Sequence, residues 1–257
     1  MLRVVATALA LAVVGGAAGA DERGYALHDF ATKKPAPLVV ALQCYGCPPA
    51  HVPALLGLED MVRRHHAMLA IPTARVDARG DSFWNATAAC CDFDGKQPDD
   101  VAYIVHVIDD AVARHGADPK QVYLVGFSNG GFLAYRVACD HADKVAAIVS
   151  VSGAAPATCS PSSPVAVLEV HGRNDEVVPA AGGKLGGGLP QLASFPSARD
   201  TIERWARVDG CSAPDANGHR RCAHGAADLW MLPGGHMPAL GRDIGEQLWQ
   251  WLAGHRK

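Results

Sequence analysis

Six short apolar runs recur along the chain and constrain its fold more than any other sequence feature. Strands that are buried on both faces of a parallel sheet have near-continuous apolar sequences. The runs of this kind are 37–42, 68–71, 122–125, 146–151, 165–170 and 229–232. Segments with helical periodicity lie between them, at about 52–66, 100–115, 130–142, 198–208 and 243–254. This alternation predicts an α/β fold with a mostly parallel central sheet and helices on both faces.

The first twenty residues differ in character from the rest of the chain. Arg3 is followed by an apolar run over 4–14 and then by small residues that end in Ala18-Gly19-Ala20. This order predicts a cleavable signal peptide over 1–20, with cleavage after Ala20. The apolar run is short for a bilayer, and no cysteine lies near the exit, so we expect no membrane anchor. Residues 21–257 are then expected to form a single domain, in a periplasm or outside the cell.

Composition narrows the possible partners of this domain. The formal net charge is −3, and lysine and arginine form no long run. A nucleic-acid surface needs clustered positive charge, so we expect no nucleic-acid partner. We also find no zinc-type ligand spacing and no dinucleotide fingerprint, which predicts neither a metal nor an organic cofactor.

The sharpest local motif is Gly126-Phe127-Ser128-Asn129-Gly130-Gly131, between a predicted strand and a predicted helix. A Gly-x-Ser-x-Gly turn in this context is typical of a nucleophile elbow, which lifts the serine hydroxyl out of the sheet. The motif predicts Ser128 as a nucleophile and the backbone N–H of Asn129 as an oxyanion donor. A structural glycine-rich turn is the alternative. A phosphate-binding loop is disfavoured because no Gly-Lys-Ser/Thr follows.

The order expected after such an elbow is an acid and then a histidine. Asp175 follows the strand 165–170 directly, and we interpret it as the acid, with Glu176 as the alternative. A turn-forming aspartate is the other interpretation. Among the histidines after Asp175, His236 follows the last predicted strand and two glycines, so we expect it to be the base. His171 and Glu169 share one strand face and are interpreted as a structural hydrogen-bonded pair, with a metal site formed together with Asp175 as the weaker interpretation.

The chain resembles the polyhydroxybutyrate depolymerase-like esterases of the α/β-hydrolase fold, a broad group that includes feruloyl and acetylxylan esterases. The resemblance runs from about 37 to 239. It rests on PLVVALQCYGC (37–47), FWNATAACCDFDG (83–95), DDVAYIVHVIDDAV (99–112), DPKQVYLVGFSNGG (118–131), HGRNDEVVP (171–179), ARDTIERWARVDGC (198–211) and GGHMPAL (234–240). It implies one α/β-hydrolase catalytic domain, a carboxylic ester hydrolase, and nucleophile, acid and base roles for Ser128, Asp175 and His236.

The resemblance also implies a second oxyanion donor after the first strand, the backbone N–H of Tyr45, with Cys44 as the alternative. Here the chain departs from its relatives, because Gln43-Cys44 stands where they usually carry His-Gly. Trp84 and Tyr45, with Phe127, could form an aromatic wall for an acyl group; core packing is the alternative for each.

Two further features bear on the substrate. No adsorbing domain follows the last predicted helix, so small soluble esters, short polyester oligomers or plant cell-wall esters are expected rather than solid polyester. The stretches 151–165 and 179–197 are too short or too glycine-rich for a large helical lid. The glycine-rich stretch could be a surface loop or a flexible wall of the site.

All eight cysteines lie in 21–257, and an even number in an exported chain favours disulfides. We predict the pair Cys211–Cys222, which closes a short loop near His236 and is also supported by the resemblance. Cys139–Cys159 is the next choice, and Cys44, Cys47, Cys90 and Cys91 are expected to pair among themselves. A redox role for the Cys44-x-x-Cys47 motif and a catalytically silent, ligand-binding domain remain as alternative functions.

Overall fold

The computed structural model describes residues 23–190, 192–215 and 220–257, so the predicted signal peptide lies outside it. The strands are β1 (Tyr25–Asp29), β2 (Ala36–Leu42), β3 (Met68–Pro72), β4 (Arg75–Val76), β5 (Ser82–Phe83), β6 (Ala117–Phe127), β7 (Ala147–Val151), β8 (Ala166–Gly172) and β9 (Ala227–Leu232). The helices are α1 (His51–Leu55), α2 (Leu58–Arg64), α3 (Asp100–His115), α4 (Asn129–Asp140), α5 (Ala198–Val208) and α6 (Ile244–Leu252), with a 3₁₀ turn at Ala142–Lys144.

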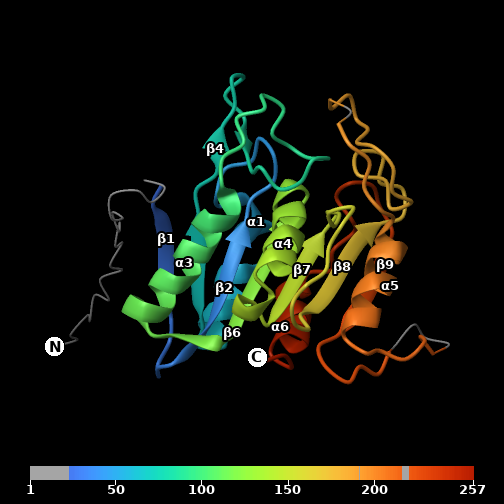
Figure 1. Cartoon of the computed structure of the whole chain (residues 1–257). Coiled ribbons are helices and arrows are strands. Elements are labelled where there is room, and N and C mark those ends of the chain that lie inside the picture. Colours follow the sequence, from blue (N-terminus) through green and yellow to red (C-terminus); the bar gives the residue numbers. More distant parts are fainter. Residues whose placement is uncertain (1–22, 191, 216–219) are drawn as a thin grey trace.

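Seven strands form one sheet in the order β1-β3-β2-β6-β7-β8-β9. Every neighbouring pair is parallel except β1 and β3, which run antiparallel at one edge (Figure 1). β4 and β5 form a separate two-stranded hairpin. The predicted mostly parallel sheet is therefore confirmed.

Helices cover both faces of the sheet because successive strand side chains point to opposite sides. In β2, Leu38, Val40 and Leu42 pack into the cluster that contains α3, α4 and α5. The intervening Val39 and Ala41 pack into the cluster that contains α1, α2 and α6. Both sets are fully buried, which explains why these strands have continuous apolar sequences.

Several elements differ from the sequence expectation, which also did not include the two-residue strands β4 and β5. The helix predicted over 52–66 is interrupted, because Gly57 adopts a left-handed conformation (φ 61°) between α1 and α2. β1 was not predicted, because it is a short edge strand whose residues, apart from Tyr25, are only partly buried. Such a strand lacks the continuous apolar run that identified the central strands.

The carboxyl ends of the parallel strands gather at one edge of the sheet, where open α/β sheets bind their ligands. The β4–β5 hairpin and the loops that follow β8 rise from this edge (Figure 1). Within the described parts of 152–165 and 173–197 there is no helix, so no large lid covers the edge. The glycine-rich stretch instead folds back on itself, with Gly183 and Phe195 paired across it.

Four disulfides join Cys44 to Cys47, Cys90 to Cys91, Cys139 to Cys159 and Cys211 to Cys222. Cys139 lies at the end of α4 and is joined to the connection before β8, while Cys211 and Cys222 lie in the connection between α5 and β9. Among the residues that the structure describes, no helix is long and apolar enough to cross a membrane.

Candidate active site

The turn from β6 into α4 holds Ser128 in an unusual backbone conformation. Its φ is 54° and its ψ is −117°, a region that residues with a side chain rarely occupy. The backbone N–H of Ser128 donates to Val151 O at 2.8 Å, which ties the turn to the neighbouring strand β7. The geometry is that of the predicted elbow, with the serine at the carboxyl edge of the sheet.

Glycines make this turn possible because the backbone is packed too closely for a side chain. A Cβ on Gly126 would lie 2.2 Å from Gly130 O, and a Cβ on Gly130 would lie 2.0 Å from Leu42 O. The second approach also places the end of β2 directly against the start of α4. The loop that follows β2 therefore begins beside Ser128.

His236 connects Ser128 to Asp175, although it lies 108 residues after Ser128 and 61 residues after Asp175 in the sequence. Its Nε2 lies 2.9 Å from Ser128 Oγ, and its Nδ1 lies 2.9 Å from Asp175 Oδ2. The loop after β9 holds the histidine here, with Gly234 at φ 110° and its carbonyl accepting from the Asn174 N–H. The His236 side chain is 22% exposed, and its ring lies 5.2 Å from that of Phe127. The three predicted residues thus lie in one hydrogen-bonded chain.

The carboxylate of Asp175 is buried and accepts hydrogen bonds at both oxygens. Oδ1 accepts from the backbone N–H groups of Val177 and Val178, each at 2.9 Å, and Oδ2 faces His236. Burial opposes ionisation, but hydrogen bonds from His171 and His236 outweigh it and lower the pKa of Asp175 below its usual value. An ionised Asp175 only accepts, so Nδ1 of His236 carries a proton and Nε2 is free to accept from Ser128. Glu176, the alternative acid, is exposed.

The loop after β2 is held by several contacts. Gln43 Nε2 donates to Cys47 O at 2.7 Å, Ser82 Oγ donates to the same oxygen at 2.7 Å, and the Cys44–Cys47 disulfide closes the turn. These cross-links hold the loop although the glycine usual in its relatives is absent. Both cysteine sulfurs are bonded to each other, so they are not free thiolates for a metal or for redox exchange while the disulfide persists.

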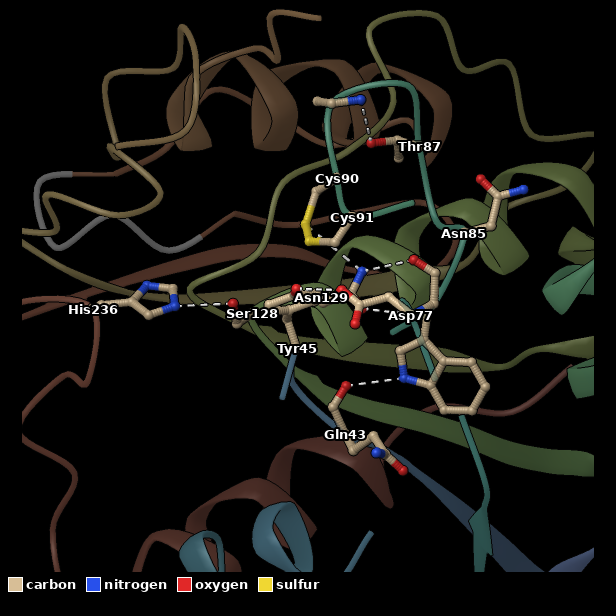
Figure 2. The surroundings of a disulfide bond; sticks show 12 residues. Gln43, Tyr45, Asp77, Asn85, Thr87, Cys90, Cys91, Ser128, Asn129 and His236 are labelled. Atoms are coloured by element: carbon tan, nitrogen blue, oxygen red, sulfur yellow. Dashed lines mark hydrogen bonds between the residues drawn. A yellow bond between two sulfur atoms is a disulfide. The ribbon is translucent and has the colours of Figure 1, made fainter. Parts of the chain in front are cut away.

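Trp84 is the residue for which the sequence interpretation was wrong. It is 0% exposed and therefore cannot form a wall of an open site. Its indole Nε1–H donates to Gln43 O at 2.9 Å, while the Asn129 side chain accepts from its backbone N–H at 2.7 Å and donates to its carbonyl at 3.0 Å. Asn129 also reaches Cys90 Sγ at 3.7 Å, beside the Cys90–Cys91 disulfide (Figure 2). Trp84 thus joins the elbow to the loop after β2.

We predict that Trp84→Phe lowers the free energy of unfolding more than Trp205→Phe does, by about 1–3 kcal/mol, because it leaves the buried Gln43 carbonyl without its donor. Trp205 is a matched control: it is equally buried, but its indole N–H has no partner among the described residues. Both substitutions remove a similar ring volume. Urea unfolding of the two variants measures the difference, and equal losses would contradict the prediction.

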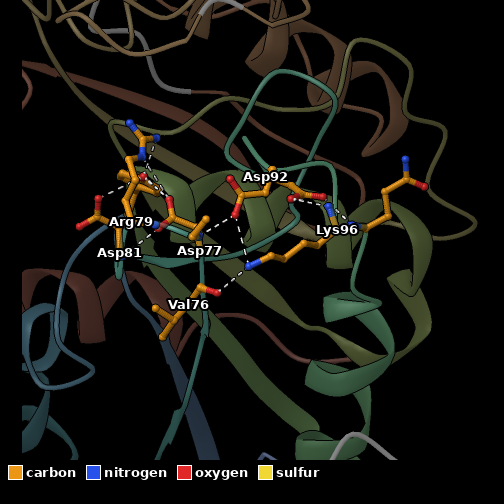
Figure 3. A network of polar contacts seen from close by, with 10 residues as sticks. Val76, Asp77, Arg79, Asp81, Asp92 and Lys96 are labelled. Carbon is orange, nitrogen blue, oxygen red and sulfur yellow. Dashed lines mark hydrogen bonds and ion pairs between the residues drawn. The ribbon is translucent and has the colours of Figure 1, made fainter.

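Tyr45 is half-buried, and its hydroxyl belongs to a polar network rather than to an open wall. It donates to Asp77 Oδ2 at 2.6 Å and accepts from Arg79 at 3.0 Å, while its ring packs edge-on against Phe93. The Tyr45 hydrogen bond lowers the pKa of Asp77 to about 2. Asp77 and Arg79 lie in the β4–β5 turn, and Lys96, from the loop before α3, donates from Nζ to Val76 O in β4 at 3.2 Å (Figure 3). Tyr45 therefore anchors this hairpin to the loop after β2.

Sequence reasoning missed two connections at this site. The Asn129 side chain was assigned no role beyond that of its backbone N–H. His171 was grouped with Asp175 only as a possible metal ligand, not as its hydrogen-bond partner, although its Nε2 lies 3.2 Å from Asp175 Oδ2. The period-two spacing of Glu169 and His171 was a signal for their own pairing, seen here at 2.7 Å. No sequence pattern indicated the contact with Asp175.

Comparison with known proteins agrees with this architecture. The phospholipase/carboxylesterase family model matches residues 96–187. The chain is 28% identical over 172 residues to a putative esterase, NocK, of Nocardia uniformis subsp. tsuyamanensis, which covers 60% of this chain and 49% of that protein. It is 30% identical over 146 residues to feruloyl esterase B of Piromyces equi, covering 50% of this chain and 24% of that protein. The chain thus spans about half or less of these curated relatives.

Solved structures match most of the chain. The acetyl xylan esterase of Aspergillus awamori superimposes with a TM-score of 0.65 at 15% identity, covering 90% of this chain and 94% of that one. A carboxylesterase from Mesorhizobium loti gives a TM-score of 0.62 at 18% identity, covering 90% and 95%. At these identities the likeness concerns the fold. The chain therefore has the α/β-hydrolase fold, and over part of its length it is similar in sequence to an esterase and to a feruloyl esterase.

Proposed function

We propose that this chain is an exported serine esterase that hydrolyses carboxylic esters through an acyl-enzyme on Ser128. The observation that carries the proposal is the hydrogen-bonded chain from Ser128 through His236 to Asp175. The similarity to esterases over about half of the chain supports the same reaction class.

In the proposed reaction, His236 Nε2 takes the hydroxyl proton of Ser128 as Oγ attacks the ester carbonyl carbon. Asp175 holds the imidazole in the required tautomer and stabilises the imidazolium. When the tetrahedral intermediate collapses, the alcohol leaves with the proton from Nε2, and the acyl group stays on Oγ. A water molecule then repeats the sequence, with His236 as its base, and releases the carboxylic acid.

The negative charge on the carbonyl oxygen needs donors beside Ser128. We assign this role to the backbone N–H groups of Asn129 and Tyr45. Asn129 begins α4, and the first N–H groups of a helix have no partner within the helix. Tyr45 lies in the cross-linked loop that starts against the elbow, and Trp84 joins the two segments. A triad with such donors requires no metal or organic cofactor.

We propose short acyl, hydroxyalkanoate-oligomer, acetyl or feruloyl esters as substrates. No helical lid covers the site in the described residues, so a long acyl chain would stay largely in water. A buried methylene contributes about 0.8 kcal/mol, which an open site does not gain as the chain lengthens.

The specificity constant is therefore expected to peak at a short acyl length and to fall for long chains. A panel of chromogenic esters of rising acyl length, run beside methyl ferulate and hydroxybutyrate oligomers, measures this. Activity that rises steadily to long chains and jumps at a lipid interface would instead indicate a lipase.

Export through the signal peptide over 1–20 is part of the proposal. The four disulfides support it, because disulfides persist in oxidising compartments. N-terminal sequencing of the protein recovered from a periplasm or culture medium tests cleavage after Ala20.

A catalytically silent hydrolase domain is the competing function. It predicts binding of esters or polymers without turnover, so the ester panel separates the two functions. A protein that hydrolyses no ester of the panel, and in which a fluorophosphonate labels no serine, would favour the silent domain. The redox alternative predicts disulfide exchange at Cys44 and Cys47, which an insulin-reduction assay tests independently.

A further inference from the structure

The hydrogen-bonded chain continues behind Asp175 into the core of the protein. His171 Nε2 lies 3.2 Å from Asp175 Oδ2, the oxygen that also faces His236. His171 Nδ1 lies 2.7 Å from Glu169 Oε1, and the Tyr135 hydroxyl donates to Glu169 Oε2 at 3.0 Å. The side chains of His171 and Glu169 are each 1% exposed. An imidazole and a carboxylate are therefore buried directly behind the acid of the site.

The contacts of His171 determine its protonation. Its Nε2 faces two acceptors, Asp175 Oδ2 and Val178 O at 2.8 Å, so this nitrogen carries a proton. Its Nδ1 faces the Glu169 carboxylate, which favours a second proton on the ring, at Nδ1. Burial alone would lower the pKa of His171, but the hydrogen bonds to Asp175 and Glu169 outweigh burial and raise it to about 10. The contacts and the raised pKa of His171 both favour an imidazolium at neutral pH, while burial also raises the pKa of its partner Glu169.

Stability does not account for this arrangement. A buried ion pair can usually be exchanged for apolar residues of similar volume at little loss, because burying two charges is costly. Asp175 also has two backbone donors on Oδ1 and His236 on Oδ2 without any help from His171. The additional cation touches the same oxygen that accepts the hydrogen bond from His236 Nδ1, which is a functional position.

We propose that His171 is a positioning residue for catalysis. Held as an imidazolium by Glu169, it fixes the orientation of Asp175 Oδ2 and reduces the negative electrostatic potential at His236. This role rests on the proposed esterase function. The cation partly offsets the negative charge of Asp175. The cation therefore weakens the pull of Asp175 Oδ2 on the proton that His236 takes from Ser128.

The neighbouring groups let the direction of the pH effect be worked out. Besides Asp175 and His236, the groups facing the pair are Tyr135 from α4 and Ser150 from β7, while β9 places Met231 beside His171 in the sheet. In His171→Gln the amide keeps an N–H toward Asp175 but carries no charge, and the unpaired, buried Glu169 takes up a proton. Without the cation, Asp175 attracts the proton on His236 more strongly. As the pH falls, activity should therefore begin to decline at a higher pH than in the wild type.

The test compares His171→Gln and Tyr135→Phe with the matched control Tyr25→Phe. The buried Tyr25 hydroxyl also donates to a carboxylate, Asp110 Oδ2, at 2.7 Å. Asp110 lies in the part of α3 that is farther from Ser128. The readouts are kcat per active site, counted by fluorophosphonate labelling, the pH profile of kcat/KM for a chromogenic acetyl ester, and ¹⁵N-histidine NMR of the whole protein.

For His171→Gln we expect kcat to fall on the order of tenfold to a hundredfold with little change in KM, because a displaced Asp175 misaligns His236. The acid limb of the profile should move up by roughly half a pH unit or more. Tyr135→Phe should shift both readouts in the same direction by less, and Tyr25→Phe should shift neither. In the wild type, the His171 resonances should remain those of a doubly protonated ring at pH 8.

Two results would overturn the proposal. One is a loss of thermal stability in both network variants with kcat per active site and the acid limb unchanged, which would make the pair purely structural. The other is a neutral His171 ring at pH 8 in the wild type. If the wild type hydrolysed no ester, the esterase proposal would fail by itself, and the NMR readout would still decide whether His171 is the buried cation.

Discussion

Ser128→Ala is expected to lower kcat/KM for a chromogenic acetyl ester by on the order of 10⁴ or more. The substitution removes the atom that forms the acyl bond and the proton that His236 Nε2 receives. Little stability should be lost, because the Ser128 side chain caps no helix and its hydrogen-bond partner among the described residues is His236 alone. The measurement is steady-state hydrolysis, with urea unfolding to confirm that the variant is folded.

Ser152→Ala is the matched control for this experiment. Ser152 is also a buried serine with a positive φ (50°) that follows a strand of the same sheet, and its Oγ has no partner among the described residues. Its removal should leave activity close to that of the wild type. A Ser128→Ala protein that kept most of its activity on every ester of the panel would refute the proposed mechanism.

Gly130→Ala is expected to destabilise the protein by about 3 kcal/mol or more, and to abolish activity in any folded fraction. Alanine favours helices over glycine, so helix propensity alone predicts the opposite. The added Cβ would lie 2.0 Å from Leu42 O and 2.8 Å from Gln43 O, both of which are backbone atoms. Relief requires moving α4 away from β2, which would displace Asn129 from the loop that carries Tyr45.

Gly241→Ala provides the control, since a Cβ there meets only the end of the Gln247 side chain at 3.9 Å and the backbone is not left-handed. Its free energy of unfolding should differ little from that of the wild type. Circular dichroism in urea compares the two alanine variants. A Gly130→Ala protein as stable as the wild type would mean that β2 and α4 are not packed this closely.

The loop after β2 shows how a departure from the related esterases is accommodated. A glycine tolerates backbone conformations that other residues avoid, and its replacement by Cys44 removes that freedom. In this chain the Cys44–Cys47 disulfide, the Gln43 side chain and the Trp84 indole hold the loop instead. These contacts fix the backbone of the loop without the conformational freedom of a glycine.

The central sheet was predictable because its physical cause is local in the sequence. Strands buried on both faces are largely apolar, and β2, most of β7 and β8, and the second half of β6 form such runs, with Ser150, Glu169 and His171 as buried polar exceptions. The helix over 100–115 was predicted at its observed bounds, since Asp99 caps it by accepting from the Ala102 N–H. The elbow was recognisable because its small residues and flanking elements are local: the exclusion at Gly126 comes from Gly130 O, four residues on. The exclusion at Gly130, in contrast, comes from Leu42 O at the end of β2.

What the sequence determined by itself is therefore the layered fold, the elbow and the chain order of the candidate serine, acid and histidine. The tertiary structure alone decided that Trp84 is a buried link rather than a wall, and that His171 lies against Asp175. Both depend on backbone paths that bring distant residues within hydrogen-bond distance, such as Trp84 with Gln43 and Asn129. An apolar or polar pattern records whether a side chain is buried, but the partner it meets there is set by how the strands and loops pack.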